Sequence, residues 1–107
     1  MNWKIKIEQE FTNAERARAN NNEGQARVCA RRAAGIAIRE YLTRRGIRPP
    51  STSSYDLLNL LKDDPLLSSD LKLIAENLTL RVTEEFKLPV DADLVTEART
   101  LCDELLK

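Results

Sequence analysis

Histidine is absent from the 107 residues of this chain, and glycine, proline, cysteine and aromatic residues are scarce. Without imidazole, no side chain titrates near neutral pH at its ordinary pKa, and a common metal ligand is missing. These absences exclude catalytic pairs and metal sites that depend on histidine. The 3 glycines and 4 prolines offer few breaks along the chain, so the sequence predicts long helices joined by short connections.

The sequence motifs of the common enzyme classes are absent as well. The chain contains no Gly-rich phosphate loop, no GxSxG nucleophile motif and no zinc-ligand spacing. Carboxylates gather at residues 63–64, 84–85 and 91–93, which fall at expected helix ends, where capping and solvation account for them. We therefore expect no catalytic residue, no metal and no cofactor. An all-carboxylate magnesium site at these positions is the alternative.

Long apolar runs are missing too. No stretch approaches the ~20 apolar residues that a membrane-spanning helix needs. Charges interrupt the apolar residues at positions 1–11, which is not typical of a signal peptide. The two cysteines, Cys29 and Cys102, lie far apart on apolar helical faces. We expect buried free thiols in a cytoplasmic protein with no membrane contact, with a disulfide or redox role as the alternative.

Apolar residues recur at three- and four-residue steps, and this spacing predicts helices over residues 3–20, 24–45, 53–63, 69–86 and 91–106. Nothing alternates with period two, so no sheet is expected. We predict a single all-α domain over 1–107, an up-and-down four-helix bundle with one additional short helix. The predicted core consists of Trp3, Ile7, Phe11, Ala30, Ala33, Ala37, Tyr41, Leu57, Leu61, Leu71, Ile74, Leu78, Val82, Ala98, Leu101 and Leu105.

Helix boundaries follow from residues that cap or interrupt helical hydrogen bonding. The run 20–24 (NNNEG) tolerates left-handed backbone and separates the first two helices. Prolines exclude helix from the stiff loop 47–52. Thr12 and Glu15 have capping-box spacing, so the alternative is that the first helix begins or kinks there. The expected N-caps of the last three helices are Ser53 or Ser54, Ser68 or Ser69, and Asp91.

The chain is electrically neutral, but its charges are unevenly distributed. Seventeen Lys and Arg balance seventeen Asp and Glu. Residues 1–50 hold eleven basic against five acidic residues, and residues 51–107 hold six against twelve. One interpretation is that the basic and acidic halves attract each other, within one chain or between two chains. The other is a basic face for an anionic partner.

Arginines gather along one side of the second predicted helix. Arg27, Arg31, Arg32 and Arg39 fall within an arc of about 140°, next to an alanine-rich apolar arc. Guanidinium groups bind phosphates through paired hydrogen bonds, so this arc is a candidate phosphate contact. A solvated face, or pairing with the acidic half, is the alternative. Gly35 lies within the arc, where a close backbone contact or chance would explain a helix-weakening residue.

Four segments follow one another in a characteristic order. An alanine-rich helix, 26–42 (ARVCARRAAGIAIREYL), precedes 54–61 (SYDLLNLL), a long helix ending at 81–86 (RVTEEF) and a closing helix, 91–106. This order resembles the HEPN superfamily of small prokaryotic helical bundles, over nearly the whole chain. The resemblance implies a helical bundle, frequent dimerisation and a nucleotide- or RNA-related setting.

Active HEPN domains carry an Arg-x4-6-His ribonuclease motif on the fourth main helix. Arg81 matches its arginine, but Phe86 stands five positions on, where a histidine would be. Tyr55 stands where the middle segment of the family often has histidine. An arginine alone binds phosphate but lacks the acid–base partner that contributes roughly 10²–10⁴-fold in rate. The resemblance therefore does not carry the nuclease activity.

Residue pattern and resemblance together predict a non-catalytic binding or regulatory module. Its expected ligand is a nucleotide, RNA or a partner protein such as a nucleotidyltransferase, and it is expected to form a homodimer. The predicted phosphate contacts are Arg27, Arg31, Arg32, Arg39 and Arg81. A purely structural homodimerisation module is one alternative. A divergent ribonuclease, acting through Arg81 with a Tyr, Glu or Asp, is the other.

Overall fold

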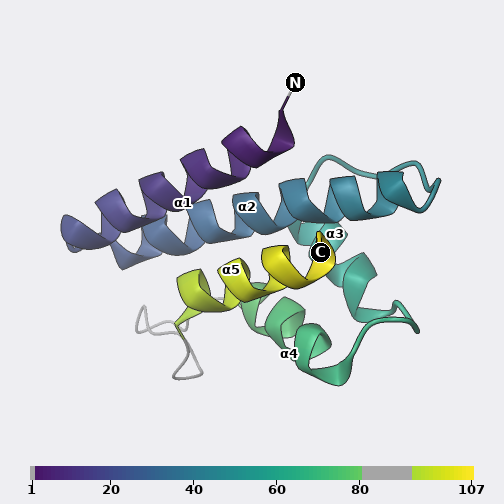
Figure 1. The fold of residues 1–107 in the computed structure, drawn as a ribbon. Helices are drawn as coiled ribbons and strands as arrows, with labels where there is room; N and C mark the ends of the chain where they lie inside the picture. The colour runs from purple at the N-terminus through teal and green to yellow at the C-terminus, as the bar shows by residue number, and fades with distance from the viewer. Residues whose placement is uncertain (1, 81–92) are drawn as a thin grey trace.

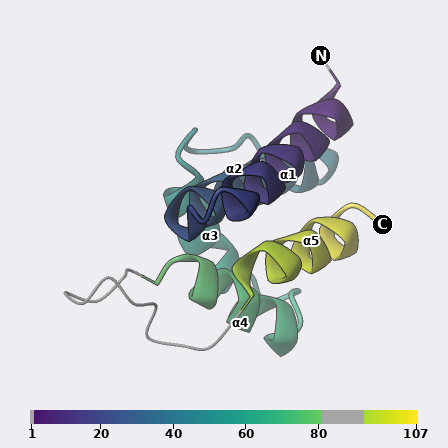
Figure 2. The ribbon, with the colours of Figure 1, turned by 90° about the vertical axis from the view of Figure 1, so that its left-hand side faces the viewer.

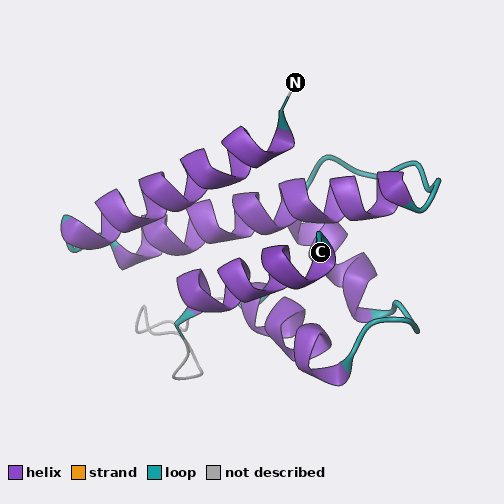
Figure 3. Cartoon of the chain, viewed as in Figure 1, coloured by secondary structure: helices purple, strands orange, loops and turns teal. Residues whose placement is uncertain are grey.

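The computed structural model describes residues 2–80 and 93–107, which form five α-helices and no β-strand (Figure 3). The prediction of an all-α fold is confirmed. Figure 1 shows the helices in chain order: α1 Trp3–Ala19, α2 Glu23–Arg44, α3 Ser54–Lys62, α4 Ser69–Leu78 and α5 Leu94–Leu105. Within this part of the chain, no helix is both long enough and apolar enough to cross a membrane.

Helices α1 and α2 form a hairpin around a turn of asparagines. Asn20 is the C-cap of α1, and Asn21 adopts the left-handed conformation (φ 59°). The Asn22 side chain accepts a hydrogen bond from the backbone N–H of Gln25 (3.1 Å). Asparagine suits such a turn because it tolerates this backbone and its amide replaces missing helical partners. α1 runs unbroken through Thr12, so the alternative start or kink there is wrong.

Helix α2 is the centre of the fold and packs against α1, α3 and α5. Its inward face is built largely from small side chains, the buried Ala26, Ala30, Ala33, Ala34 and Ala37. Such residues let neighbouring helices approach closely. α5 runs parallel to α2, as contacts at both ends show. At the start of the two helices, Arg18 binds Asp93 (3.0 Å), and at their ends Arg44 donates to the Leu106 carbonyl (3.3 Å).

The core lies between the α1–α2 hairpin and helices α3, α4 and α5, which Figure 2 shows below the hairpin. Most of the predicted core is buried, and both cysteines are buried free thiols, as expected. The predicted core residues at its edge, Trp3, Tyr41, Leu71 and Ile74, are only partly buried. Val82 lies outside the described residues. The core also includes Ile38 and Leu58, which are not among the predicted core residues.

Helix α4 is shorter than predicted, so α3 and α4 are both short. The predicted helix over 69–86 is wrong at its end, because α4 ends at Leu78 with Thr79 as its C-cap. The Thr79 hydroxyl donates to the Glu76 carbonyl (2.7 Å), and Arg31 of α2 donates to the Leu78 carbonyl (2.6 Å). These bonds satisfy carbonyls that a continuing helix would have used. Residues 81–86 lie outside the described part of the chain.

The last three helices begin at side-chain caps. Ser53 and Ser68 are confirmed as N-caps, each accepting a backbone N–H at 3.3 Å. The N-cap of α5 is Asp93 rather than the predicted Asp91, which lies outside the described residues. Asp93 accepts from the backbone N–H of Thr96 (3.2 Å) and is also held by Arg18 of α1, a contact that local sequence does not reveal.

Candidate nucleic-acid interface

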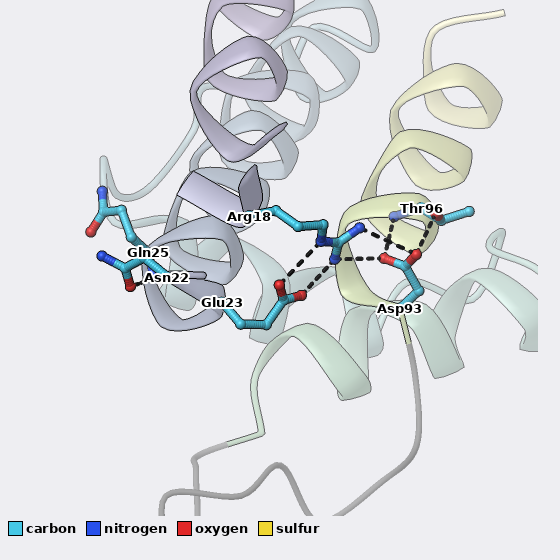
Figure 4. Close-up of polar contacts among 6 residues, drawn as sticks. All are labelled: Arg18, Asn22, Glu23, Gln25, Asp93 and Thr96. Atoms are coloured by element: carbon cyan, nitrogen blue, oxygen red, sulfur yellow. Dashed lines mark hydrogen bonds and ion pairs between the residues drawn. The ribbon is translucent and has the colours of Figure 1, made fainter. Parts of the chain in front are cut away.

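At the turn end of the hairpin, one arginine joins the turn to α5 (Figure 4). Arg18 donates to Glu23 (2.6 and 3.1 Å) and to Asp93 (3.0 and 3.4 Å). These hydrogen bonds lower the pKa of both carboxyl groups and raise the pKa of Arg18. The charge of the Arg18 guanidinium is therefore balanced by two carboxylates of the protein, and the group is not left for an external phosphate.

The predicted arginine arc on α2 does not form one surface, because the start of α3 packs against its middle. A Cβ added to Gly35 would lie 2.2 Å from Ser54 Oγ and 2.8 Å from Ser54 Cβ. Only glycine leaves room for this approach. Of the two explanations offered for Gly35, a close contact is the one that the structure confirms. Around the helix, Gly35 lies between Arg31 and Arg32, so α3 separates these two neighbours in sequence.

On the side of α2 that faces α4, Arg31 is built into the fold. Its Nε donates to the Leu78 carbonyl (2.6 Å) and its Nη2 to the Leu80 carbonyl (3.2 Å). These carbonyls lie at the C-terminal end of α4, where the partial negative charge of a helix favours a cation. Burial, and then the neighbouring Arg27, lower the pKa of Arg31. Arg31 therefore anchors the end of α4, and Arg27 lies partly buried beside it.

On the other side of α2, Arg32 and Arg39 lie beside α1. Arg32 lines one hollow between the two helices together with Arg16, and Arg39 lines another with Lys6. We call these four residues, Lys6, Arg16, Arg32 and Arg39, the cationic seam. Within the described residues, none of their side chains forms an ion pair or a hydrogen bond. Their charges are therefore directed to solvent or to a ligand.

The two hollows of the seam differ in size and character. The larger, of 310 Å³, lies next to the hairpin turn and contains Ala17, Cys29 and a polar set, Asn13, Arg16, Asn20, Asn22, Gln25 and Arg32. The smaller, of 190 Å³, lies near the open end of the hairpin, where Trp3 adjoins Lys6 and Arg39. Glu40 also lines it, but its carboxylate pairs with Arg44. Cations beside hydrogen-bonding groups suit phosphates and base edges better than an apolar ligand.

Sequence reasoning missed Lys6, Arg16 and the amides because it considered the arginines of the second helix alone. The signal was available, since the short turn at 20–24 makes the first two helices neighbours and brings their outer faces together. Arg81, the remaining predicted contact, lies outside the described residues. Phe86, at the ribonuclease-motif position, lies outside them as well.

A second pair of hollows, which we call the α1–α5 furrow, lies between α1 and α5. Arg99 of α5 lines both, pairs with Glu8 of α1 and stacks over the Phe11 ring (4.0 Å). The bond to Arg99 lowers the pKa of Glu8. Cys102 lines the larger hollow, of 280 Å³, but burial raises the pKa of its thiol to about 12. At neutral pH this cysteine is a protonated thiol and a poor nucleophile.

A tyrosine–carboxylate–arginine cluster bears on the ribonuclease alternative. Tyr41 donates to Asp64 (2.9 Å), and Arg45 donates to the same carboxylate (2.8 Å). Burial, and then the bond to Asp64, raise the pKa of Tyr41, which disfavours the ionised form that a base would need. The cluster ties the end of α2 to the loop after α3. Among the described residues, no three His, Cys, Asp or Glu side chains are placed to hold a metal ion.

Comparison with known proteins assigns no family to this chain. No protein-family model, no curated protein and no solved structure matches it. The structure itself shows an all-helical domain whose described residues form five helices.

Proposed function

We propose that this domain is a non-catalytic binding module that contacts RNA through the cationic seam. One observation carries the proposal, namely that the four seam cations have no internal partner within the described residues. By contrast, four other arginines, Arg18, Arg44, Arg45 and Arg99, are paired with carboxylates. Part of the positive excess of the first half is therefore left unpaired along this seam.

RNA suits the seam by charge and by length. Lys6 and Arg16 are ten residues apart on α1, which corresponds to ~15 Å along a helix. A row of cations of this length can neutralise several phosphates of one strand, and the release of their counterions favours binding. The hollows between the cations offer hydrogen-bonding groups to unstacked bases, which single-stranded RNA presents.

The HEPN resemblance supports an RNA-related setting and adds partners to the proposal. It suggests a helical bundle that forms a homodimer and pairs with a nucleotidyltransferase-type protein. The α1–α5 furrow favours a second copy of this chain as an additional candidate partner. Ile5 is 63% exposed on α1, one turn from Glu8, and the furrow carries both charge signs in Glu8 and Arg99. A twofold axis through the furrow would bring Glu8 of one copy near Arg99 of the other, so that the internal pair could be exchanged for pairs between the copies.

The RNA proposal is tested by fluorescence anisotropy with a labelled single strand of about 12 nucleotides, from about 50 to 200 mM salt. The seam variant is Arg32→Gln with Arg39→Gln. We expect the wild type to bind and the seam variant to lose affinity, with a salt slope lower by about 1.4, or about 0.7 for each lost phosphate contact. Circular dichroism checks that both proteins are folded.

The matched control is Arg48→Gln with Lys72→Gln, which removes the same charge from the loop after α2 and from α4, outside both seam hollows. It is expected to bind like the wild type. Equal weakening of both variants, or no binding by the wild type at low salt, would contradict the proposal. Cleaved RNA after incubation would support the ribonuclease alternative instead.

The dimer candidate is tested by sedimentation equilibrium. We expect Ile5→Glu to shift dimers to monomers, since it places a charge in the proposed contact. The matched substitution Leu73→Glu, at a residue 55% exposed on α4, should leave the mass unchanged. A wild type that is monomeric at every concentration removes this candidate.

A further inference from the structure

The larger hollow of the cationic seam holds more amide side chains than a phosphate contact requires. Four of its residues are amides, Asn13, Asn20, Asn22 and Gln25, and they surround Arg16 and Arg32. Each amide presents both N–H donors and a carbonyl acceptor. Phosphate oxygens offer only acceptors, whereas a ligand that also carries N–H groups can use the amide carbonyls as well.

Several of these polar atoms remain free for a ligand. The Asn22 carbonyl is used by the Gln25 backbone N–H (3.1 Å), and the Gln25 Nε2 lies 3.7 Å from Cys29 Sγ. The Gln25 carbonyl oxygen has no hydrogen bond among the described residues, and neither do the side chains of Asn13 and Asn20. The hollow therefore offers donors and acceptors side by side, next to two unpaired guanidinium groups.

We infer that this hollow holds one adenosine nucleotide, either free or as a unit of RNA. Arg16 and Arg32 would contact its phosphate, because guanidinium forks match phosphate oxygens. An amide donates to N7 and accepts from the N6 amino group of adenine, so Gln25, with Asn13 or Asn20, would read the base. A volume of 310 Å³ is at the small end of ligand pockets, which suits one nucleotide. The inference rests on the proposed phosphate-binding role of the seam.

The test is an NMR titration of the full chain with AMP, GMP, CMP, UMP and inorganic phosphate. We expect AMP to bind at least about tenfold more tightly than inorganic phosphate, a difference of about 1.4 kcal/mol, and more tightly than the other nucleotides. The largest amide shifts should lie at the hairpin turn. Equal affinity for AMP and inorganic phosphate would overturn the inference while leaving seam-dependent RNA binding intact. Failure of RNA binding alone would remove the proposed function but not the AMP pocket.

Gln25→Met separates base reading from phosphate binding. This variant should lose the preference for AMP and still bind inorganic phosphate. The control, Gln9→Met, alters an exposed glutamine of α1 that does not line the hollow, and it should keep the preference. Loss of the preference in both variants, or in neither, would overturn the assignment.

Oligoadenylate and oligouridylate distinguish the two sources of the nucleotide. Tighter binding of oligoadenylate would identify a unit of RNA as the ligand. If AMP binds more tightly than the other nucleotides but the two oligonucleotides bind equally, the ligand is the free nucleotide.

Discussion

The two sides of α2 use the same residue type in opposite ways. On the side facing α4, Arg31 is half-buried and donates to two backbone carbonyls. On the side facing α1, the next residue, Arg32, is exposed and has no internal partner among the described residues. The tight approach of Ser54 to Gly35 separates the two sides. A row of arginines on one helix therefore contains both structural anchors and candidate ligand contacts.

The difference follows from what each side faces rather than from the residues themselves. Carbonyls at the end of α4 carry partial negative charge that a buried guanidinium can satisfy. Along the α1–α2 seam, the neighbouring groups are other cations, neutral amides and Glu40. The Glu40 carboxylate pairs with Arg44, so the seam cations have no ion-pair partner among the described residues. Substitutions on each side should therefore have separable effects on stability and on binding.

The largest expected effect comes from disrupting the core next to Arg31, on the side of α2 that faces α4. Leu78 is fully buried, and its carbonyl accepts the Arg31 bond. Leu78→Asp should prevent folding, because a lone buried carboxylate costs several kcal/mol against a total stability of about 5–15 kcal/mol. Leu73→Asp, on the exposed side of α4, should melt like the wild type by circular dichroism. A cooperative, unshifted melt of Leu78→Asp would show that α4 is misplaced.

Gly35→Ala tests the contact with Ser54 that separates the two sides of α2. The added methyl group overlaps Ser54, whose backbone Cα lies only 3.1 Å from the new Cβ. Urea denaturation should show a loss of about 1–3 kcal/mol, as for other overpacked sites, although alanine is the better helix former. Gly24→Ala, with nothing closer than 3.9 Å, should be neutral or stabilising by up to about 1 kcal/mol. Equal stability of the two variants would disprove the close approach.

Arg31→Met and Arg32→Met sharpen the comparison directly. Arg31→Met should cost about 1–2 kcal/mol in unfolding free energy, because it removes charged hydrogen bonds to carbonyls. Arg32→Met should change stability by less than about 0.5 kcal/mol, as expected for an exposed site. RNA affinity should fall more in Arg32→Met than in Arg31→Met. The reverse order in both measurements would mean that the two sides have been assigned the wrong way round.

Acid should produce the smallest effect, at the turn that joins the hairpin to α5. Hydrogen bonds from Arg18 lower the folded-state pKa of Glu23 and Asp93 below their ordinary values of 4.5 and 3.8. The stability they contribute is present above about pH 5 and is lost as the pH falls through the folded-state pKa values. Since these groups are largely exposed, the loss should be modest.

The acid effect is measured by chemical denaturation at a series of pH values between neutrality and pH ~3. Arg18→Met should flatten the profile, because it removes the partner that lowers both pKa values. Lys72→Met, which removes a cation from α4, should retain the wild-type profile. An unchanged profile in Arg18→Met would show that the Arg18 hydrogen bonds contribute nothing to acid stability.

Local sequence was a good guide to elements whose limits depend on local chemistry. The spacing of apolar residues predicted five helices, and Ser53 and Ser68 were identified as caps because their side chains bond backbone groups a few residues away. The end of α4 and the start of α5 were wrong, because Arg31 and Arg18, distant in sequence, take part in fixing them. The candidate site was predicted only in part, since half of the seam comes from α1.

The sequence by itself determined an all-α domain, its alanine-rich central helix, its uneven charge and the lack of histidine chemistry. Each of these depends on composition or on a period of a few residues. Only the tertiary structure decided that Arg31 anchors α4 and that Arg32 joins Arg16 at a polar hollow. It also decided that α3 packs on Gly35 and so separates Arg31 from Arg32. Packing decides which groups lie opposite each charge and therefore which charges are neutralised. Periodicity along one helix does not identify those groups.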